Sequence, residues 1–246
     1  MNKPRKVALI TGAAHRIGAE MARQLHQAGI NIALHYRHSQ QPAETLAAEL
    51  NGKRPDSAIL IQADLLDTPT LADVVTQASQ AWQRLDILIN NASTFYPTEI
   101  GAATEAHWDD LMGSNLKAPF FLAQAAAAEL TRQQGCIINI IDIHSQRPMK
   151  GYPIYSAAKA GLAMLTMSLA RELGPEVRVN GVAPGAILWP EHELDQQAKN
   201  DILDRTVLKR QGSAADIAKA ALFLIQDADY ISGQIINVDG GRTLSF

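Results

Sequence analysis

The sequence predicts a single α/β domain built on a parallel, doubly wound sheet of about seven strands, with helices on both faces. Three observations support this fold class. Short apolar runs alternate along the 246 residues with longer amphipathic or alanine-rich runs, which is the order of strands joined by crossover helices. The strand runs are apolar nearly throughout, as expected when helices bury both faces of the sheet. No linker rich in proline, glycine or serine divides the chain, so we expect residues 1–246 to form one domain.

The expected strands are short and the expected helices are longer. The strand candidates are Val7–Thr11, Asn31–His35, Ala58–Gln62, Asp86–Asn90, Cys136–Asp142, Arg178–Ala183 and Gln234–Val238. The helix candidates are Ile17–Ala28, Ala43–Leu50, Leu71–Trp82, Trp108–Leu130, Ile154–Leu173 and Ala214–Ile225. A long polar stretch at residues 185–213, which contains Trp189 and Pro190, interrupts the alternation. A connection of that length just past a strand end is usually functional, so we expect a substrate loop there.

Composition limits the class of protein. Hydrophobic residues make up 47% and charged residues 19% of the chain, which is the profile of a globular protein, and the net charge of -3 argues against a general nucleic-acid binder. The only cysteine, Cys136, cannot form an internal disulfide or a cysteine-based metal cluster, and we expect no metal site. The N-terminus leads straight into a first strand, and no apolar run approaches membrane-spanning length. We therefore expect a cytoplasmic protein without a membrane partner.

A glycine-containing turn follows the first strand. It runs from Thr11 through Gly12, Arg16 and Ile17 to Gly18, where the first helix begins. Glycine lets the backbone approach a pyrophosphate, and the positive end of the helix then stabilises the phosphate charge. A tight strand–helix turn without a ligand is the alternative interpretation.

The end of the second strand indicates which dinucleotide binds. In dinucleotide folds a carboxylate at this position accepts hydrogen bonds from the adenosine ribose, but here the chain continues with Tyr36, Arg37, His38 and Ser39. A guanidinium and a hydroxyl suit a 2′-phosphate, which a carboxylate would repel. We therefore predict NADPH/NADP+ as the cofactor, with a solvated surface side chain as the alternative interpretation of Arg37.

Two later strand ends are further candidates for cofactor contacts. Asp64 and Leu65 follow the third strand and are placed to contact the adenine edge, although Asp64 fits a helix cap equally well. Asn91, Ala92 and Ser93 follow the fourth strand, where small and amide side chains can pass close to a ribose. Both positions belong to the edge of the sheet at which ligands bind in such folds.

Asp142, Tyr155 and Lys159 form a candidate proton-transfer site. Asp142 ends an apolar strand, and Tyr155 and Lys159 are four residues apart, which places them on one face of a helix. Because an ammonium near a phenol favours the phenolate, we expect Lys159 to lower the pKa of Tyr155. A loop cap or an ion-pair partner is the alternative role for Asp142.

Taken in order, these motifs resemble the short-chain dehydrogenase/reductase family over essentially the whole chain. Besides the glycine turn and the Tyr-x-x-x-Lys motif, the match includes Asn90-Asn91-Ala92, Asn115, Pro184-Gly185 and Asp239-Gly240-Gly241. The resemblance implies a Rossmann-type sheet and a nicotinamide cofactor held in part by Tyr155, Lys159, Pro184 and Gly185. It also implies catalytic roles for Asn115, Tyr155 and Lys159.

Three departures from the common family pattern coincide in one subgroup that the chain resembles, the pteridine reductases. Arg16 stands where the family usually has glycine, Ser93 replaces the glycine of Asn-Asn-Ala-Gly, and Asp142 replaces the catalytic serine thirteen residues before the tyrosine. The resemblance implies that Asp142 and Tyr155 deliver a proton. Arg16 and Ser93 then contact both cofactor and substrate, although Arg16 also fits a helix-surface cation.

Two aromatic residues complete the predicted substrate site. Phe95 lies in a polar loop, and the resemblance implies that it forms a stacking wall for a flat pterin ring. Ordinary core packing is the alternative interpretation of Phe95. Tyr152 lies close in sequence to the catalytic tyrosine, and we expect it to form a hydrogen bond with Asp142 or with the substrate.

The predicted function is the NADPH-dependent reduction of pteridines, by hydride transfer and protonation of a ring nitrogen. The substrate is a dihydropterin, with dihydrofolate as a further candidate. Two alternatives stay open, namely a 3-oxoacyl or other carbonyl reductase and an NADP(H)-binding regulator without chemistry. Asp142 and Phe95 count against the first, and the complete catalytic set counts against the second. The family resemblance also implies a homotetramer, in which residues 242–246 are a candidate to reach a neighbouring subunit's site.

Overall fold

A computed structural model describes residues 4–187 and 195–245, in which seven strands form one sheet. Trp189 and Pro190 of the expected substrate loop lie outside the described residues. The strands are β1 (Val7–Ile10), β2 (Asn31–Tyr36), β3 (Ala58–Gln62), β4 (Ile87–Asn90), β5 (Cys136–Ile140), β6 (Arg178–Pro184) and β7 (Ile235–Val238). They are parallel and ordered β3-β2-β1-β4-β5-β6-β7, with the reversal of strand order between β1 and β4. The predicted doubly wound α/β fold is confirmed.

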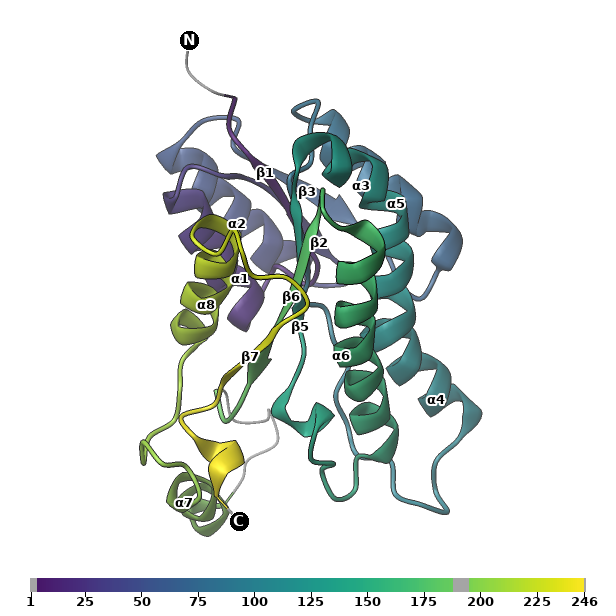
Figure 1. Ribbon diagram of the computed structural model, residues 1–246, viewed down its shortest axis with the longest axis vertical. Coiled ribbons are helices and arrows are strands. Elements are labelled where there is room, and N and C mark those ends of the chain that lie inside the picture. The colour runs from purple at the N-terminus through teal and green to yellow at the C-terminus, as the bar shows by residue number, and fades with distance from the viewer. Residues whose placement is uncertain (1–3, 188–194, 246) are drawn as a thin grey trace.

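Helices cover both faces of this sheet (Figure 1). One layer contains α1 (Arg16–Gln27), α2 (Gln40–Lys53) and α8 (Ala214–Gln226), and the other contains α3 (Leu71–Gln80), α4 (Glu105–Met112), α5 (Ala118–Gln133) and α6 (Pro153–Leu173). Ile10 packs in the apolar cluster under the first layer together with Leu25, and its neighbour Leu9 packs under the second together with Leu122. Successive residues of β1 are therefore buried on opposite faces, which explains why the strands lack polar alternation. Among the described residues, no helix combines the length and apolar character needed to cross a lipid bilayer.

The helix expected at Trp108–Leu130 is divided in the structure. A π-helical segment (Gly113–Lys117) separates α4 from α5. Within it, the Asn115 side chain donates a hydrogen bond to the Leu111 carbonyl oxygen (2.9 Å). That side chain competes for an acceptor of the regular helical ladder, and the helix is wound differently at this point.

A further helix, α7 (Gln196–Asp204), lies within residues 185–213, where the sequence analysis expected only a loop. No side chain of α7 is fully buried, and Ile202 and Leu203 are its only large apolar residues, so the periodic signal from which helices are predicted is weak. Asp195 caps its beginning by accepting a hydrogen bond from the Ala198 N–H (2.7 Å). This cap is the sequence signal that identifies the helix.

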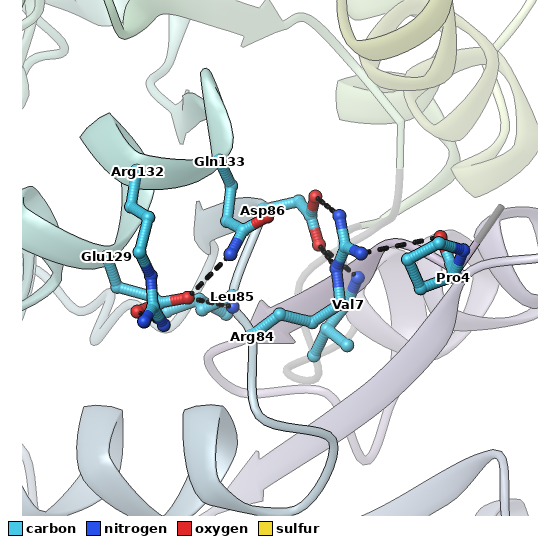
Figure 2. A network of polar contacts seen from close by, with 8 residues as sticks. All are labelled: Pro4, Val7, Arg84, Leu85, Asp86, Glu129, Arg132 and Gln133. Atoms are coloured by element: carbon cyan, nitrogen blue, oxygen red, sulfur yellow. Dashed lines mark hydrogen bonds and ion pairs between the residues drawn. The ribbon is translucent and has the colours of Figure 1, made fainter.

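The buried carboxylate of Asp86 joins segments at the amino ends of the central strands (Figure 2). Its Oδ2 accepts hydrogen bonds from the Val7 N–H (2.8 Å) and from Nε of Arg84 (2.9 Å), and its Oδ1 accepts one from Nη2 of Arg84 (2.6 Å). Beside it, Glu129 of α5 accepts a hydrogen bond from the Leu85 N–H (3.2 Å). These contacts fix β1 and β4 against α5 at the edge of the sheet opposite the carboxyl ends of the strands.

Replacing Asp86 with alanine leaves a mostly buried guanidinium without its partner, because the Arg84 side chain is only 17% exposed. We expect the free energy of unfolding to fall by roughly 3–5 kcal/mol, as when one member of a buried ion pair is removed. Glu49→Ala is the control, since Glu49 pairs with Arg23 and Lys53 at the surface, and there the loss should stay below about 1 kcal/mol. Urea denaturation followed by circular dichroism measures both changes. Equal losses would contradict the role assigned to Asp86.

Candidate active site

A cavity of about 670 Å³ runs along the carboxyl ends of the strands. Its walls come from the segments that follow all seven strands and from α1, α6 and α7. The predicted site residues that line it are Gly12, Arg16, Ile17, Gly18, Tyr36, Arg37, His38, Ser39, Asp64, Leu65, Asn91, Ala92, Ser93, Phe95, Asp142, Tyr152, Tyr155, Lys159, Pro184 and Gly185. Asn115 is the exception among the predicted residues and lies fully buried behind the wall.

The turn after β1 is held in place by side-chain hydrogen bonds and by close packing. Gly12 has a φ of +61°, a left-handed conformation that glycine adopts without strain. The Asn91 side chain donates hydrogen bonds to the carbonyl oxygens of Thr11 (2.9 Å) and Gly12 (3.0 Å). A Cβ atom at Gly18 would lie 2.3 Å from the Gly12 carbonyl oxygen, so only glycine fits there. The start of α1 therefore forms the cavity wall, a position that fits a pyrophosphate.

Arg16 has a backbone conformation that usually belongs to glycine. Its φ is +52°, and a left-handed residue of this kind costs about 1–2 kcal/mol when it carries a Cβ atom. The same residue lines the cavity. Strained residues concentrate at functional sites, because only a useful side chain offsets the strain.

His35 is a cavity residue that the sequence analysis did not select as part of the site. It is buried, its Nδ1 accepts a hydrogen bond from the Gly12 N–H (3.2 Å), and its Nε2 lies 3.2 Å from the Ala63 carbonyl oxygen. Burial lowers the pKa of His35 to about 4, so the ring is neutral at pH 7 and Nε2 donates its proton to Ala63. His35 thus ties the turn after β1 to the end of β3. The available signal was a histidine inside an otherwise apolar strand.

Arg37 at the end of β2 forms an ion pair with Asp64 from the end of β3 (Nη2 to Oδ2, 2.7 Å). Asp64 also accepts a hydrogen bond from the Leu66 N–H (3.0 Å), which closes a turn. It is not the helix cap considered for it, because the helical segments that follow begin after Asp67 and Thr70. A carboxylate is therefore present near the end of β2, but the neighbouring strand supplies it. Both side chains are about 40% exposed, and exposed pairs contribute only about 0–1 kcal/mol, so an incoming anion can compete for Arg37.

The Tyr155 hydroxyl donates a hydrogen bond to Oδ2 of Asp142 (2.8 Å). The other carboxylate oxygen, Oδ1, accepts one from the His144 N–H (2.8 Å) and caps the 3₁₀ turn Ile143–Ser145. Capping fixes the carboxylate while leaving Oδ2 directed at the phenol. Asp142 is therefore a loop cap and the partner of Tyr155 at the same time, although the sequence analysis treated these roles as alternatives.

The surroundings of Tyr155 favour the protonated phenol, so the expected lowering of its pKa is wrong. Burial, followed by the charge of the Asp142 carboxylate, raises the pKa of Tyr155 well above its usual value. Lys159 is engaged elsewhere, since its Nζ donates a hydrogen bond to the Ile140 carbonyl oxygen (3.0 Å) and lies 5.7 Å from the centroid of the tyrosine ring. Burial lowers the pKa of Lys159 to about 8. Tyr155 therefore stays protonated at neutral pH and has a proton to donate.

Phe95 and Tyr152 form a stacked pair in the cavity wall. Their ring centroids are 4.7 Å apart and their planes are inclined by 11°. Phe95 also meets the Tyr155 ring edge-on, at 4.8 Å and 75°. Because Phe95 is 39% exposed and lines the cavity, it is not a core residue. Tyr152 packs flat on Phe95, and the hydrogen bond to Asp142 that was expected for it is not formed within the described part of the chain.

Asn115 contacts the cavity through Ser93. The Ser93 hydroxyl donates a hydrogen bond to Oδ1 of Asn115 (2.7 Å), while Nδ2 of Asn115 donates to the carbonyl oxygens of Thr94 (3.0 Å) and Leu111 (2.9 Å). The amide thus fixes the loop after β4 against the π-helical segment. Segments of this kind are frequent at functional sites.

Comparisons with known proteins agree with this geometry. A family model described as enoyl-(acyl carrier protein) reductase matches residues 12–243. Pteridine reductase 1 of Leishmania tarentolae is 38% identical over an alignment of 280 positions, which covers 97% of this chain and 96% of that protein. The 3-oxoacyl-(acyl-carrier-protein) reductase FabG of Staphylococcus aureus strain Mu50 is 37% identical over 243 residues, covering 97% and 98% respectively. The chain belongs to the short-chain dehydrogenase/reductase family.

As a short-chain dehydrogenase/reductase, the protein is an oxidoreductase of a family that uses nicotinamide cofactors and small-molecule substrates. The three positions at which it departs from the common family pattern, Arg16, Ser93 and Asp142, all line the same cavity. Within the described residues, no group of three or more histidine, cysteine or acidic side chains is arranged to hold a metal ion.

The C-terminal segment of this short-chain reductase contributes Arg242 to the cavity of its own chain. From the sequence alone, residues 242–246 are a candidate only for a neighbouring subunit's site. Arg147, in the loop after β5, donates a hydrogen bond to the Ser245 carbonyl oxygen (3.4 Å) and holds this segment near the cavity. Phe246 lies outside the described residues.

The conformation of Arg16 predicts a stability difference between two variants. Arg16→Ala and Arg16→Gly both remove the guanidinium, but only glycine removes the cost of the left-handed backbone. We expect Arg16→Gly to be more stable than Arg16→Ala by about 1–2 kcal/mol. Urea denaturation of the two proteins measures the difference. An Arg16→Ala protein as stable as Arg16→Gly would show that the backbone at this position carries no strain.

Proposed function

We propose that the protein is an NADPH-dependent reductase that converts a dihydropterin, or dihydrofolate, to the tetrahydro form. The observation that carries the proposal is the hydrogen bond between Tyr155 and Asp142 (2.8 Å) on the wall of a cavity that also contains the half-exposed ring of Phe95. The reaction adds a hydride to a ring carbon and a proton to the adjacent ring nitrogen. Bound NADPH supplies the hydride, and the side chains supply the proton.

The proton comes from the Tyr155 and Asp142 pair. Tyr155 holds its proton at neutral pH, because burial and the neighbouring carboxylate raise its pKa, and the hydrogen bond to Asp142 gives a path for that proton. A carboxylate would repel the alkoxide that forms when a ketone is reduced. A dihydropterin instead presents ring N–H and amino groups, which a carboxylate accepts. Asp142 therefore favours a nitrogen heterocycle over a carbonyl substrate.

The aromatic wall suits a flat substrate. Phe95 and Tyr152 lie face to face beside the Asp142 and Tyr155 pair. The ring of Tyr155 contacts Phe95 edge-on. Aromatic rings prefer offset-stacked or edge-on neighbours at these distances. A bicyclic pterin fits such a wall better than the flexible acyl chain of a 3-oxoacyl thioester. Ser93 and Arg16 line the same cavity and are assigned here to both substrate and cofactor.

The cofactor would lie along the remaining cavity residues. Arg16, Ile17, Gly12 and Gly18 would hold the pyrophosphate, Asp64 and Leu65 the adenine, Asn91 and Ala92 the adenosine-side ribose, and Tyr155, Lys159, Pro184 and Gly185 the nicotinamide riboside. Because Lys159 is buried against the Ile140 carbonyl oxygen, its ammonium is already positioned for a ribose hydroxyl.

NADPH is favoured over NADH by the residues that end β2. Arg37, Ser39 and their neighbours Tyr36 and His38 line the adenosine end of the cavity. The guanidinium of Arg37 already forms an exposed ion pair with one anionic partner, Asp64. A 2′-phosphate offers the same guanidinium more oxygen acceptors and a higher charge.

A carbonyl reductase is the second candidate function. The FabG relative, a 3-oxoacyl-(acyl-carrier-protein) reductase, is 37% identical, nearly as similar as the pteridine reductase at 38%. Overall identity therefore does not discriminate between these activities. The local chemistry of Asp142 and Phe95 favours the pteridine.

We expect the active form to be a homotetramer in the cytoplasm. Trp108, Phe120 and Met164 are exposed large apolar side chains on α4, α5 and α6. Exposed large apolar side chains are enriched at interfaces between subunits.

Removing the Asp142 carboxylate tests the proposed reaction. We expect Asp142→Ala to lose about 10²–10⁴-fold in kcat with dihydrobiopterin, because the proton path is broken, while NADPH affinity stays unchanged. Asp109→Ala, an exposed acidic residue outside the cavity, is the control. The assay follows NADPH oxidation with dihydrobiopterin and, in parallel, with an acetoacetyl thioester. Wild-type turnover of the thioester alone would rule out the pteridine function and favour the second candidate.

Charge reversal at Arg37 tests the choice of cofactor. We expect Arg37→Asp to weaken NADPH binding by about 10²-fold or more, through loss of charge-assisted hydrogen bonds and new repulsion, and to leave NADH binding within a small factor. Arg171→Asp, an exposed position on α6, is the matched control. Fluorescence titration with each dinucleotide gives the dissociation constants. Equal weakening of both dinucleotides would show that Arg37 does not recognise the 2′-phosphate.

A further inference from the structure

Arg242 lines the cavity and has a guanidinium nitrogen without a hydrogen-bond partner among the described residues. The residue begins the short 3₁₀ turn Arg242–Leu244 after β7 and lines the cavity beside Asp142. Its Nη1 atom is buried and makes no hydrogen bond to any residue that the structure describes. A buried donor without an acceptor costs free energy, and such groups in native proteins require an explanation. Nη1 itself is closed to solvent, but other atoms of Arg242 line the cavity, so an acceptor on a ligand that turns the guanidinium toward it is an explanation that the position supports.

The two carboxylates whose charges act on Arg242 are held by other donors. Asp142 accepts hydrogen bonds from the Tyr155 hydroxyl and from the His144 N–H. Asp239 accepts two backbone N–H hydrogen bonds within its own turn (2.9 and 2.8 Å). Both are close enough to influence the Arg242 charge, but neither forms a hydrogen bond with its Nη1 atom. The cation at this end of the cavity is therefore not neutralised by a direct pair within the described residues.

A second cation lies in the same region. Arg205 ends α7, and its charge, after burial, contributes to lowering the pKa of Arg242. The C-terminal turn and α7 lie side by side beyond the carboxyl ends of the strands (Figure 1). Arg205 does not line the cavity itself, but its charge adds to that of Arg242 in the cavity wall, and two like charges close together favour a bound anion.

We infer that Arg242, assisted by Arg205, binds an anionic group on the side chain of the pteridine substrate, either a carboxylate or a phosphate ester. This inference rests on the proposed function. Arg242 and Asp142 line the same cavity, so the substituent of a ring bound at Asp142 would extend along the wall that includes Arg242. The planar guanidinium matches both carboxylate and phosphate oxygens with parallel N–H donors. The preferred substrate is thus a dihydropterin with an acidic tail and not one with a neutral side chain.

Kinetics with three substrates tests the inference. Dihydrofolate carries a glutamate tail, a dihydropterin phosphomonoester carries a phosphate, and dihydrobiopterin carries a neutral side chain. We expect Arg242→Gln to raise KM for one or both acidic substrates by about 10- to 100-fold with little change in kcat, and to leave KM for dihydrobiopterin and the NADPH dissociation constant within about twofold. Whichever acidic substrate responds more identifies the anion. Arg242→Lys should restore part of the affinity.

Controls separate this inference from folding and from the proposed function. Arg210→Gln removes an exposed arginine outside the cavity and should change none of the constants, and thermal melting checks that each variant is folded. Wild-type KM for the sensitive substrate should rise with salt, and this rise should disappear in Arg242→Gln. If the wild type reduces dihydrobiopterin but Arg242→Gln changes all three substrates equally, or none, only the anion site is overturned. If the wild type reduces none of the three, the pteridine function fails and the anion site fails with it.

Discussion

The common direction of the seven strands is the constraint on which the site depends. Because all strands are parallel, their carboxyl ends meet at one edge, and residues as distant in sequence as Gly12 and Arg242 line a single cavity there. The opposite edge carries the network around Asp86, which fixes the amino ends of β1 and β4. The cavity and the network around Asp86 therefore lie at opposite ends of the same strands.

The hydrogen bond between Asp142 and Tyr155 determines what the cavity can do chemically. A serine at position 142 would leave the phenol without a neighbouring negative charge, whereas the carboxylate and burial together raise the pKa of Tyr155. Lys159 cannot reverse this effect, because its ammonium is held by the Ile140 carbonyl oxygen. The Tyr155 hydroxyl thus keeps its proton at neutral pH, beside an aromatic wall. This arrangement suits protonation of a heterocyclic nitrogen better than polarisation of a ketone.

Most of the fold was predictable because it depends on local patterns. Unbroken apolar runs gave the strands, and their order gave the parallel sheet. The π-helical segment and α7 were not predictable from periodicity, since the first coincides with side-chain contacts of Asn115 and the second buries no side chain fully. In the site, motif positions identified the residues of the cavity. The sequence did not show which of these residues pair with one another. The ion pair between Asp64 and Arg37 depends on the order of strands in the sheet. The pKa of Tyr155 depends on its contact with Asp142, which only the structure shows.

Arg16 and Arg242 each have a cost that the fold alone does not explain. Glycine at position 16 would avoid a left-handed φ of +52°, and a neutral residue at position 242 would avoid a buried, unpaired nitrogen. Both residues line the cavity, with the acid pair of Asp142 and Tyr155 also in its wall. The two arginines suit anionic groups, namely a cofactor phosphate and an acidic substrate tail. The carboxylate of Asp142 suits the uncharged ring of the substrate. The charge pattern of the cavity therefore agrees with the proposed reduction of an acidic substrate by a bound dinucleotide.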